Sequence, residues 1–146
     1  MKTVFQELIS DRPFWLALVA GPAFWVALGL AMQPHFLPAW PLARPMDFVS
    51  VSLLYPVVEE IVFRGLLQGW LAERLRCRAW RGLSAANIAT SVSFTALHFF
   101  YHPPLYAASV FIPSLIFGYF RERHDDLTAP IALHVWYNAG YFWIFG

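Results

Sequence analysis

Residues 48–71, FVSVSLLYPVVEEIVFRGLLQGWL, decide how this chain folds. The stretch is long enough to cross a bilayer as a helix, which takes about 20 mostly apolar residues. It is apolar except for a small polar group: Glu59, Glu60, Arg64 and Gln68. A charged side chain at mid-bilayer costs about 2.5–3.5 kcal/mol on insertion scales, so these charges need partners inside a protein interior. The stretch therefore predicts a membrane-spanning helix with a functional polar face.

The composition of the whole chain also indicates a lipid environment. The 146 residues are 59% hydrophobic, 18% aromatic and 13% charged, whereas soluble domains carry about 25% charged residues. A chain of this length cannot bury so much apolar surface in water. The formal net charge of +1 and the absence of a basic face give no indication of nucleic-acid binding. The single cysteine, Cys77, excludes an intrachain disulfide.

Further stretches have the length and composition of membrane spans, and we predict an all-α, polytopic transmembrane helix bundle of about five spans. The predicted spans are residues 14–32, 48–71, 84–101, 105–120 and 127–145. No cleavage pattern follows the first span, so we expect it to remain in the mature protein. The predicted connectors are a proline-rich segment at 33–47, an arginine-rich loop after residue 71, a tight connection at 102–104 and a charged turn at 121–126. We expect a single integral membrane domain, 1–146.

The distribution of Lys and Arg predicts a cytoplasmic N-terminus. With that orientation, the outer segments carry only Arg44. The inner segments carry Lys2, Arg12, Arg74, Arg76, Arg78, Arg81, Arg121 and Arg123. We therefore expect a multi-pass protein of the cell inner (cytoplasmic) membrane with its C-terminus outside.

The polar face of residues 48–71 has the composition of an acid–base site. Glu60 and Arg64 stand at i and i+4, where an ion pair forms on one helix face. Glu59 is rotated about 100° from Glu60 and has no cation of its own on this helix. Two adjacent carboxylates resist joint ionisation, so one stays anionic beside arginine and the other exchanges protons, as a general base must. Pro56 predicts a kink that admits water, with an ordinary tolerated proline as the equal alternative.

Polar residues recur in other predicted spans. His98 lies near the end of the third span and His134 in the fifth, with Asn138 four residues later on the same helix face. Taken singly, such residues often form hydrogen bonds that hold neighbouring helices together. A Glu–Arg pair can likewise serve only to fix the helix register. Together in so small a bundle, they indicate a function. The remaining histidines fall in connectors and are interpreted as surface residues: His35, His102 and His124.

These residues form short motifs: EEIVFR at 59–64, FTALH at 94–98 and HVWYN at 134–138. They resemble the E-E-x-x-x-R, F-x-x-x-H and H-x-x-x-N motifs of the CaaX protease and bacteriocin-processing (CPBP) family. That family includes the Ras-converting CaaX endopeptidase. Each motif is weak alone, but all occur in family order, and the ordered set is highly specific. The resemblance covers about residues 47–146.

The resemblance implies a glutamic-type intramembrane endopeptidase that uses no covalent intermediate, no cofactor and no metal. Glu59 would act with His98 as the general base on a water molecule. His134 and Asn138 would form the oxyanion hole, where each such donor is worth about 10²–10³ in rate. The predicted ion pair, Glu60 with Arg64, would support the site. This chain is smaller than most members of the family, so its substrate-binding helices would be either reduced or supplied by an oligomer.

The expected partners are the lipid bilayer and a membrane-anchored peptide or protein substrate. A chain this small with a complete motif set looks bacterial. A C-terminal sorting segment is therefore a better expectation for the substrate than a prenylated CaaX sequence. The same bundle also suits a non-catalytic bacteriocin-immunity or scaffold protein, which is the first alternative.

The sequence supports other enzymatic mechanisms and a transport function less well. A zinc-dependent membrane peptidase would use Glu and His ligands, but the helical H-E-x-x-H signature is absent. A serine mechanism lacks a Gly-x-Ser motif in a span, and an aspartyl mechanism lacks an intramembrane pair because Asp125 and Asp126 lie in the charged turn. Intramembrane Glu and His also suit a proton relay or small transporter, yet the chain shows no inverted repeat.

Overall fold

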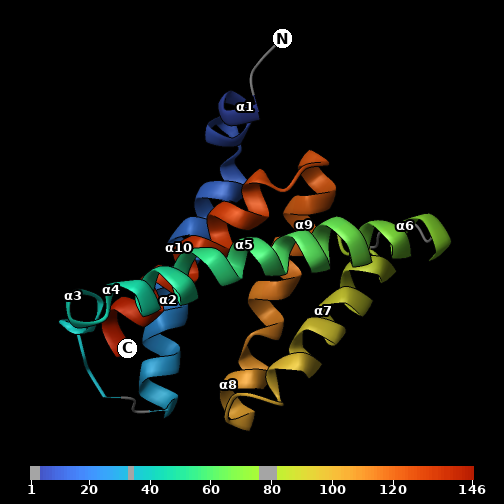
Figure 1. Cartoon of the computed structure of the whole chain (residues 1–146). Coiled ribbons are helices and arrows are strands. Elements are labelled where there is room, and N and C mark those ends of the chain that lie inside the picture. Colours follow the sequence, from blue (N-terminus) through green and yellow to red (C-terminus); the bar gives the residue numbers. More distant parts are fainter. Residues whose placement is uncertain (1–3, 33–34, 76–81) are drawn as a thin grey trace. The chain divides into compact units, whose positions relative to one another are not determined.

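The computed structural model is built of helices, and it describes residues 4–32, 35–75 and 82–146. Within these ranges it contains no β-strand, so the all-α prediction is confirmed. The number of membrane spans remains a prediction. The helices are α1 Val4–Ser10, α2 Arg12–Met32, α3 Trp40–Ala43, α4 Pro45–Val49, η1 Ser50–Leu54, α5 Tyr55–Glu60, η2 Ile61–Gln68, α6 Gly69–Leu75, α7 Ala85–His98, α8 Pro104–Ser109, α9 Phe111–His124 and α10 Thr128–Phe145 (Figure 1).

The chain groups into two compact units. Unit 1 comprises Met1–Val58 and Ile131–Gly146, and unit 2 comprises Glu59–Pro130. The chain passes from one to the other inside α5 and again inside α10. The three motifs are therefore divided: the first two lie in unit 2 and the third lies in unit 1.

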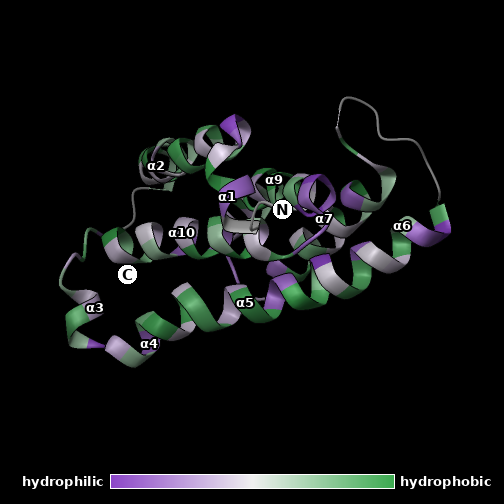
Figure 2. Ribbon diagram, turned by 90° about the horizontal axis from the view of Figure 1, so that it is seen from above, coloured by the Kyte–Doolittle hydropathy of each residue, from purple (hydrophilic) through white to green (hydrophobic). Residues whose placement is uncertain are grey.

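In unit 1, α2 corresponds to the predicted span 14–32. Of the helices in the described ranges, α2 alone has the length and hydropathy to cross a membrane. It exposes large apolar side chains, among them Leu16 at 73% and Leu30 at 75%, as contact with lipid or with another protein requires. Hydrophobic residues occupy much of this helix in Figure 2.

Side-chain donors on α10 tie it to backbone carbonyls of α2. The Trp136 indole donates to the Leu18 carbonyl at 2.9 Å, and the Tyr137 hydroxyl donates to the Ala17 carbonyl at 2.6 Å. In the other direction, the Trp25 indole donates to the Tyr137 carbonyl at 2.8 Å. These bonds satisfy the polar ends of aromatic side chains whose rings supply apolar packing.

The predicted span 48–71 lies within an unbroken helical run from 45 to 75, in which α-helix alternates with the π-helical segments η1 and η2. The Tyr55 N–H donates to the Ser50 carbonyl, and the next residue, Pro56, has no N–H to give. The kink predicted at Pro56 stays a prediction, and the run is π-helical on both sides of α5. Such turns occur frequently at functional sites.

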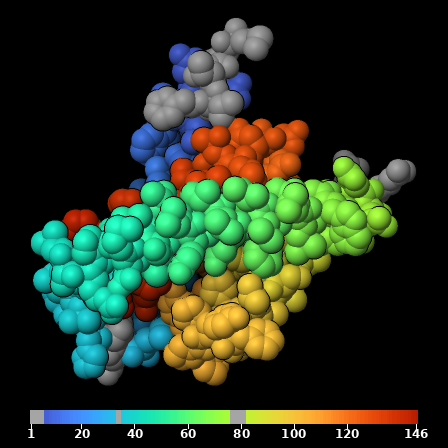
Figure 3. Space-filling view, in the orientation of Figure 1, coloured from blue at the N-terminus to red at the C-terminus, as the bar shows by residue number. Residues whose placement is uncertain are grey.

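The outward face of this run in unit 2 is apolar. Leu66 is 66% exposed and Trp70 is 50% exposed. The side chains of the run are turned toward the reader in Figure 3. As on α2, exposed apolar side chains of this size suit contact with lipid.

In unit 2, the predicted span 105–120 is interrupted rather than continuous. Helix α8 ends at Ser109 and α9 begins at Phe111, with Val110 between them. Pro113 lies in the first turn of α9, where a missing N–H costs no helical hydrogen bond. Helix α9 then continues to His124, so the charged turn predicted at 121–126 begins only at Asp125, whose φ is 54°. An Arg121–Asp125 ion pair of 2.7 Å adds to the last turn.

Part of the predicted orientation depends on residues outside the described ranges. The arginine-rich loop with Arg76, Cys77, Arg78 and Arg81 falls there, as do Lys2 and Pro34. The cytoplasmic N-terminus therefore stays a prediction.

Candidate functional site

A row of polar side chains is buried along one face of the helical run in unit 2. Glu60 and Arg64 are 0% exposed, and Gln68 is 1% exposed. These residues stand four apart and therefore face the same side of the helix. Oε2 of Glu60 lies 3.4 Å from Nε of Arg64, which confirms the ion pair predicted from their spacing.

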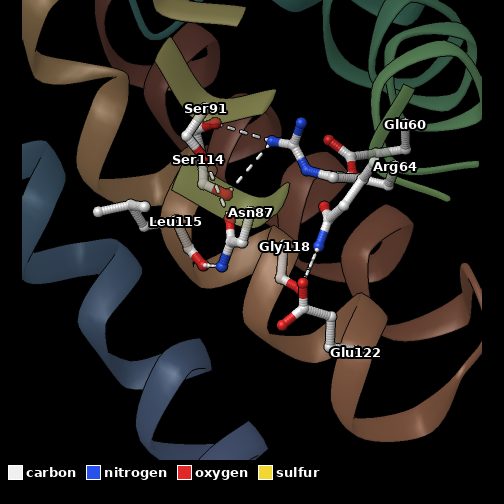
Figure 4. Close-up of polar contacts among 9 residues, drawn as sticks. Glu60, Arg64, Asn87, Ser91, Ser114, Leu115, Gly118 and Glu122 are labelled. Carbon is white, nitrogen blue, oxygen red and sulfur yellow. Dashed lines mark hydrogen bonds and ion pairs between the residues drawn. The ribbon is translucent and has the colours of Figure 1, made fainter. Parts of the chain in front are cut away.

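Helix α9 presents matching polar groups to this row. The Arg64 guanidinium donates from Nη2 to the Ser114 hydroxyl at 2.9 Å and to the Ser114 carbonyl at 3.3 Å (Figure 4). The Gln68 amide donates to the Gly118 carbonyl at 3.0 Å and to Oε1 of Glu122 at 2.8 Å. The groups on α9 are also four residues apart, so the polar contact repeats from turn to turn.

Helix α7 completes this buried polar cluster. The Asn87 amide donates to the Leu115 carbonyl at 3.0 Å, and the Ser91 hydroxyl donates to Oδ1 of Asn87 at 3.2 Å. Ser84 caps α7 by accepting the Asn87 N–H at 2.9 Å, and its hydroxyl donates to Glu122. Hydrogen bonds between buried polar side chains favour one packing arrangement of the helices. The cluster therefore holds the helix that carries Glu59 and Glu60 against α7 and α9.

Sequence reasoning named Glu60, Arg64 and Gln68 but missed the rest of the cluster. Its other members are the buried Asn87, Ser91 and Ser114 and, at its edge, Ser84 and the exposed Glu122. A signal was present in the sequence, because Gln68 continues the four-residue spacing of the ion pair and Ser114 and Glu122 repeat that spacing on α9.

Glu59 is half-buried beside the fully buried Glu60. One turn further on, the Phe63 ring packs edge to face against the Phe94 ring, with centroids 5.1 Å apart and planes at 89°. Near the other end of the interface, Ala72 and Leu75 line a hollow together with Ser84 and Ala86.

These contacts give the relative direction of the two helices within unit 2. Residue numbers increase along α7 in the direction in which they decrease along the 45–75 run. The two helices are therefore antiparallel. One turn back from Phe63 is Glu59, and one turn on from Phe94 is His98. Glu59 and His98 therefore belong to the same end of the interface between these helices.

The hydrogen bond of His98 determines its tautomer. Its Nδ1 lies 2.9 Å from the Phe94 carbonyl oxygen. Because a carbonyl can only accept, Nδ1 donates, and Nε2 is the basic nitrogen of the neutral ring. A histidine in this form can take a proton at Nε2.

His102 is exposed, as predicted, but it is more than a surface residue. Its ring stacks on the His98 ring at 5.5 Å, with the planes 22° apart, and lies 4.7 Å from the Tyr106 ring. Burial and the neighbouring His98 lower the pKa of His102.

His134 and Asn138 lie in unit 1, on α10. His134 is buried, with 4% of its surface exposed. The half-buried Asn138 donates from Nδ2 to the Val51 carbonyl at 3.0 Å. A side-chain amide nitrogen carries two hydrogens, so Asn138 has a second donor to offer. Within unit 1 these residues stand four apart, in the spacing that the third motif predicts.

Within the described ranges, no three or more His, Cys, Asp or Glu side chains gather closely enough to hold a metal ion. Zinc sites usually take three or four protein ligands. The expected independence from metals and cofactors remains a prediction.

Residues 40–140 match the family model of type II CAAX prenyl endopeptidase Rce1-like proteins. The chain belongs to this family. The matched region contains the first two motifs and the third, so the resemblance seen in the sequence is confirmed.

A relative in Escherichia coli, an uncharacterized 24.3 kDa protein, is 30% identical to this chain over 90 residues. The aligned region covers 62% of this chain and 40% of that protein, so the chain spans less than half the length of this relative. No solved structure matches the chain.

Proposed function

We propose that this Rce1-like chain is a glutamic-type intramembrane endopeptidase that hydrolyses a peptide bond in a membrane-anchored protein or peptide. The observation that carries the proposal is the Phe63–Phe94 contact in unit 2. Because the helices are antiparallel there, this contact assigns the Glu59 carboxylate and the His98 imidazole to the same end of one interface. A carboxylate and an imidazole in that arrangement suit the activation of water.

The ion pair supports Glu59 over Glu60 as the glutamate that does the chemistry. Glu60 is fully buried, and its Oε2 lies 3.4 Å from Nε of Arg64, so this carboxylate is engaged in the ion pair. Glu59 is half-buried and one position earlier, so it is the carboxylate suited to exchange protons.

In the first step, Glu59 and His98 take a proton from water while the water oxygen bonds to the scissile carbonyl carbon. The carbonyl oxygen becomes an oxyanion. The family's third motif implies that His134 and Asn138 are the donors to it, and such donors act on charge that develops only in the transition state. The proton then passes to the amide nitrogen, the C–N bond breaks, and no bond to the enzyme forms.

The apolar surfaces of the helices support a substrate that is anchored in the membrane. Exposed side chains such as Leu16, Leu30 and Leu66 suit a protein surrounded by lipid. The substrate is then a membrane-anchored peptide or a C-terminal sorting segment, cleaved in the cell inner membrane by a protein whose N-terminus is cytoplasmic. A second copy of the chain would supply the substrate-binding helices of the longer family members.

The test uses purified protein in proteoliposomes with membrane-anchored peptides whose cleavage separates a fluorophore from its quencher. Glu59→Gln should abolish cleavage without lowering the unfolding midpoint. Glu73→Gln is the matched control, because Glu73 is an exposed glutamate on the same helical run. Cleavage should also persist in a metal chelator. A Glu59→Gln protein that cleaves at the normal rate refutes the assigned role, and loss of activity in chelator favours the zinc alternative.

The second candidate is a non-catalytic immunity or scaffold protein. The buried polar cluster favours it, because Asn87, Ser114 and Gln68 make contacts that serve helix packing alone. Retention of full cellular function by Glu59→Gln and His98→Ala variants would support that candidate over the protease.

A further inference from the structure

Four ring side chains in unit 2 form one column of neighbouring rings, in which His98 and His102 are stacked and the other two pairs are tilted. Phe94 lies 4.5 Å from His98, His98 lies 5.5 Å from His102, and His102 lies 4.7 Å from Tyr106, as measured between ring centroids. The residues are four apart in sequence, although α7 ends at His98 and α8 begins at Pro104. The backbone N–H of His102 donates to the His98 carbonyl at 2.9 Å. This bond continues the four-residue helical spacing into the turn between α7 and α8.

We propose that His102 is a positioning residue that holds the His98 imidazole in the orientation needed for water activation. The inference rests on the function proposed above. The His98 ring is bounded by Phe94 and by His102, and Tyr106 backs His102. A ring bounded in this way keeps its Nδ1–H on the Phe94 carbonyl and directs Nε2 along one line. A displacement of about 1 Å at a catalytic group can cost about 10²-fold in rate.

Repulsion between the rings of His98 and His102 limits the number of protons that the pair holds. The repulsion between two imidazolium rings 5.5 Å apart makes the second protonation harder by about half a pH unit, even in a water-like dielectric. Arg64 of the helical run faces the column, and Tyr106 of α8 is its last ring. The Arg64 guanidinium lies 5.1 Å from the Phe94 ring centre. The charged residues of α9 lie in its last turn, far along the helix from α8. This repulsion between the two rings disfavours protonation of His102 while His98 carries a proton.

The kinetic test compares variants of the full chain in proteoliposomes. His102→Ala should lower kcat about tenfold or more and leave KM unchanged. His102→Phe should restore most of the rate, because phenylalanine keeps a ring against His98. The matched control is His124→Ala. His124 stacks on Phe120 at 6.0 Å, also four residues away, so its removal deletes a similar ring contact without touching His98.

A second readout needs no cleavage. Nitrogen-15 NMR of the His98 ring, recorded on the full chain in detergent micelles, should report the Nδ1–H tautomer in the wild type, His102→Phe and His124→Ala. His102→Ala should show a mixture of tautomers. If this pattern appears in a protein that cleaves no probe, the protease proposal fails and the positioning role stands. If the wild type cleaves and His102→Ala matches it in kcat and in ring shifts, the positioning role is overturned.

Discussion

Gly118 and Asn87 approach each other so closely that a side chain at position 118 has no room. A Cβ built on Gly118 would lie 2.0 Å from Oδ1 of Asn87. Asn87 cannot easily move aside, because its amide is bonded to the Leu115 carbonyl and it accepts from Ser91. The absence of a side chain on Gly118 therefore lets α9 and α7 meet at the polar cluster of unit 2.

Gly118→Ala should destabilise the protein by about 1–3 kcal/mol, as overpacking of a tight interior does. The control is Gly69→Ala, because a Cβ at Gly69 meets nothing within 4 Å. That substitution should be neutral or stabilise the helix by up to about 1 kcal/mol. Equilibrium unfolding in mixed micelles measures both changes. Equal stabilities for the two variants would show that the Asn87 contact is not tight in solution.

Arg64→Met should destabilise the fold by about 3–5 kcal/mol, because it leaves the buried Glu60 carboxylate without its cation. The double variant Glu60→Gln/Arg64→Met should be less destabilised than Arg64→Met alone, since no buried charge remains. Arg44→Met is the matched control: Arg44 forms an ion pair with Asp47, but its side chain is 68% exposed. Exposed pairs contribute little, about 0–1 kcal/mol. A double variant less stable than Arg64→Met would contradict the expected charge penalty.

Asn138→Asp should lower kcat by about 10²–10³, because the carboxylate repels the developing oxyanion and offers no N–H. Tyr137→Phe, next to it on α10, removes the hydroxyl that donates to the Ala17 carbonyl. We expect that control to cost about 1 kcal/mol of stability and to keep the normal kcat. A rate loss in Tyr137→Phe as large as in Asn138→Asp would assign both effects to packing.

Acidification should weaken unit 2 through His102. Burial and the nearby His98 lower the pKa of His102 below its ordinary value of 6.5, so the unfolded chain binds this proton more tightly than the folded protein. Its contribution to stability is therefore complete above about pH 6.5 and is lost as the pH falls through the pKa of the folded state. The unfolding midpoint should drop between pH 7.5 and pH 5, and His102→Phe should reduce that drop. An unchanged drop in the variant would exclude His102 as its source.

The features that the sequence predicted correctly are those set by local spacing. Glu60 and Arg64 pair because residues four apart on a helix always share a face. Helix α2 follows the uninterrupted apolar stretch 14–32 closely. The break at Val110 was missed, because residues 105–120 are apolar throughout and periodicity alone does not reveal where a helix stops.

By itself, the sequence determined the all-helical class, the buried ion pair and the ordered motifs that mark the family, since each depends on neighbours along the chain. Only the tertiary structure decided that Arg64 bonds to Ser114, 50 residues away, and that Phe63 meets Phe94. It also decided that His102 stacks on His98. Those contacts depend on how helices pack, and helix spacing says which side chains share a face but not which distant helix that face will meet.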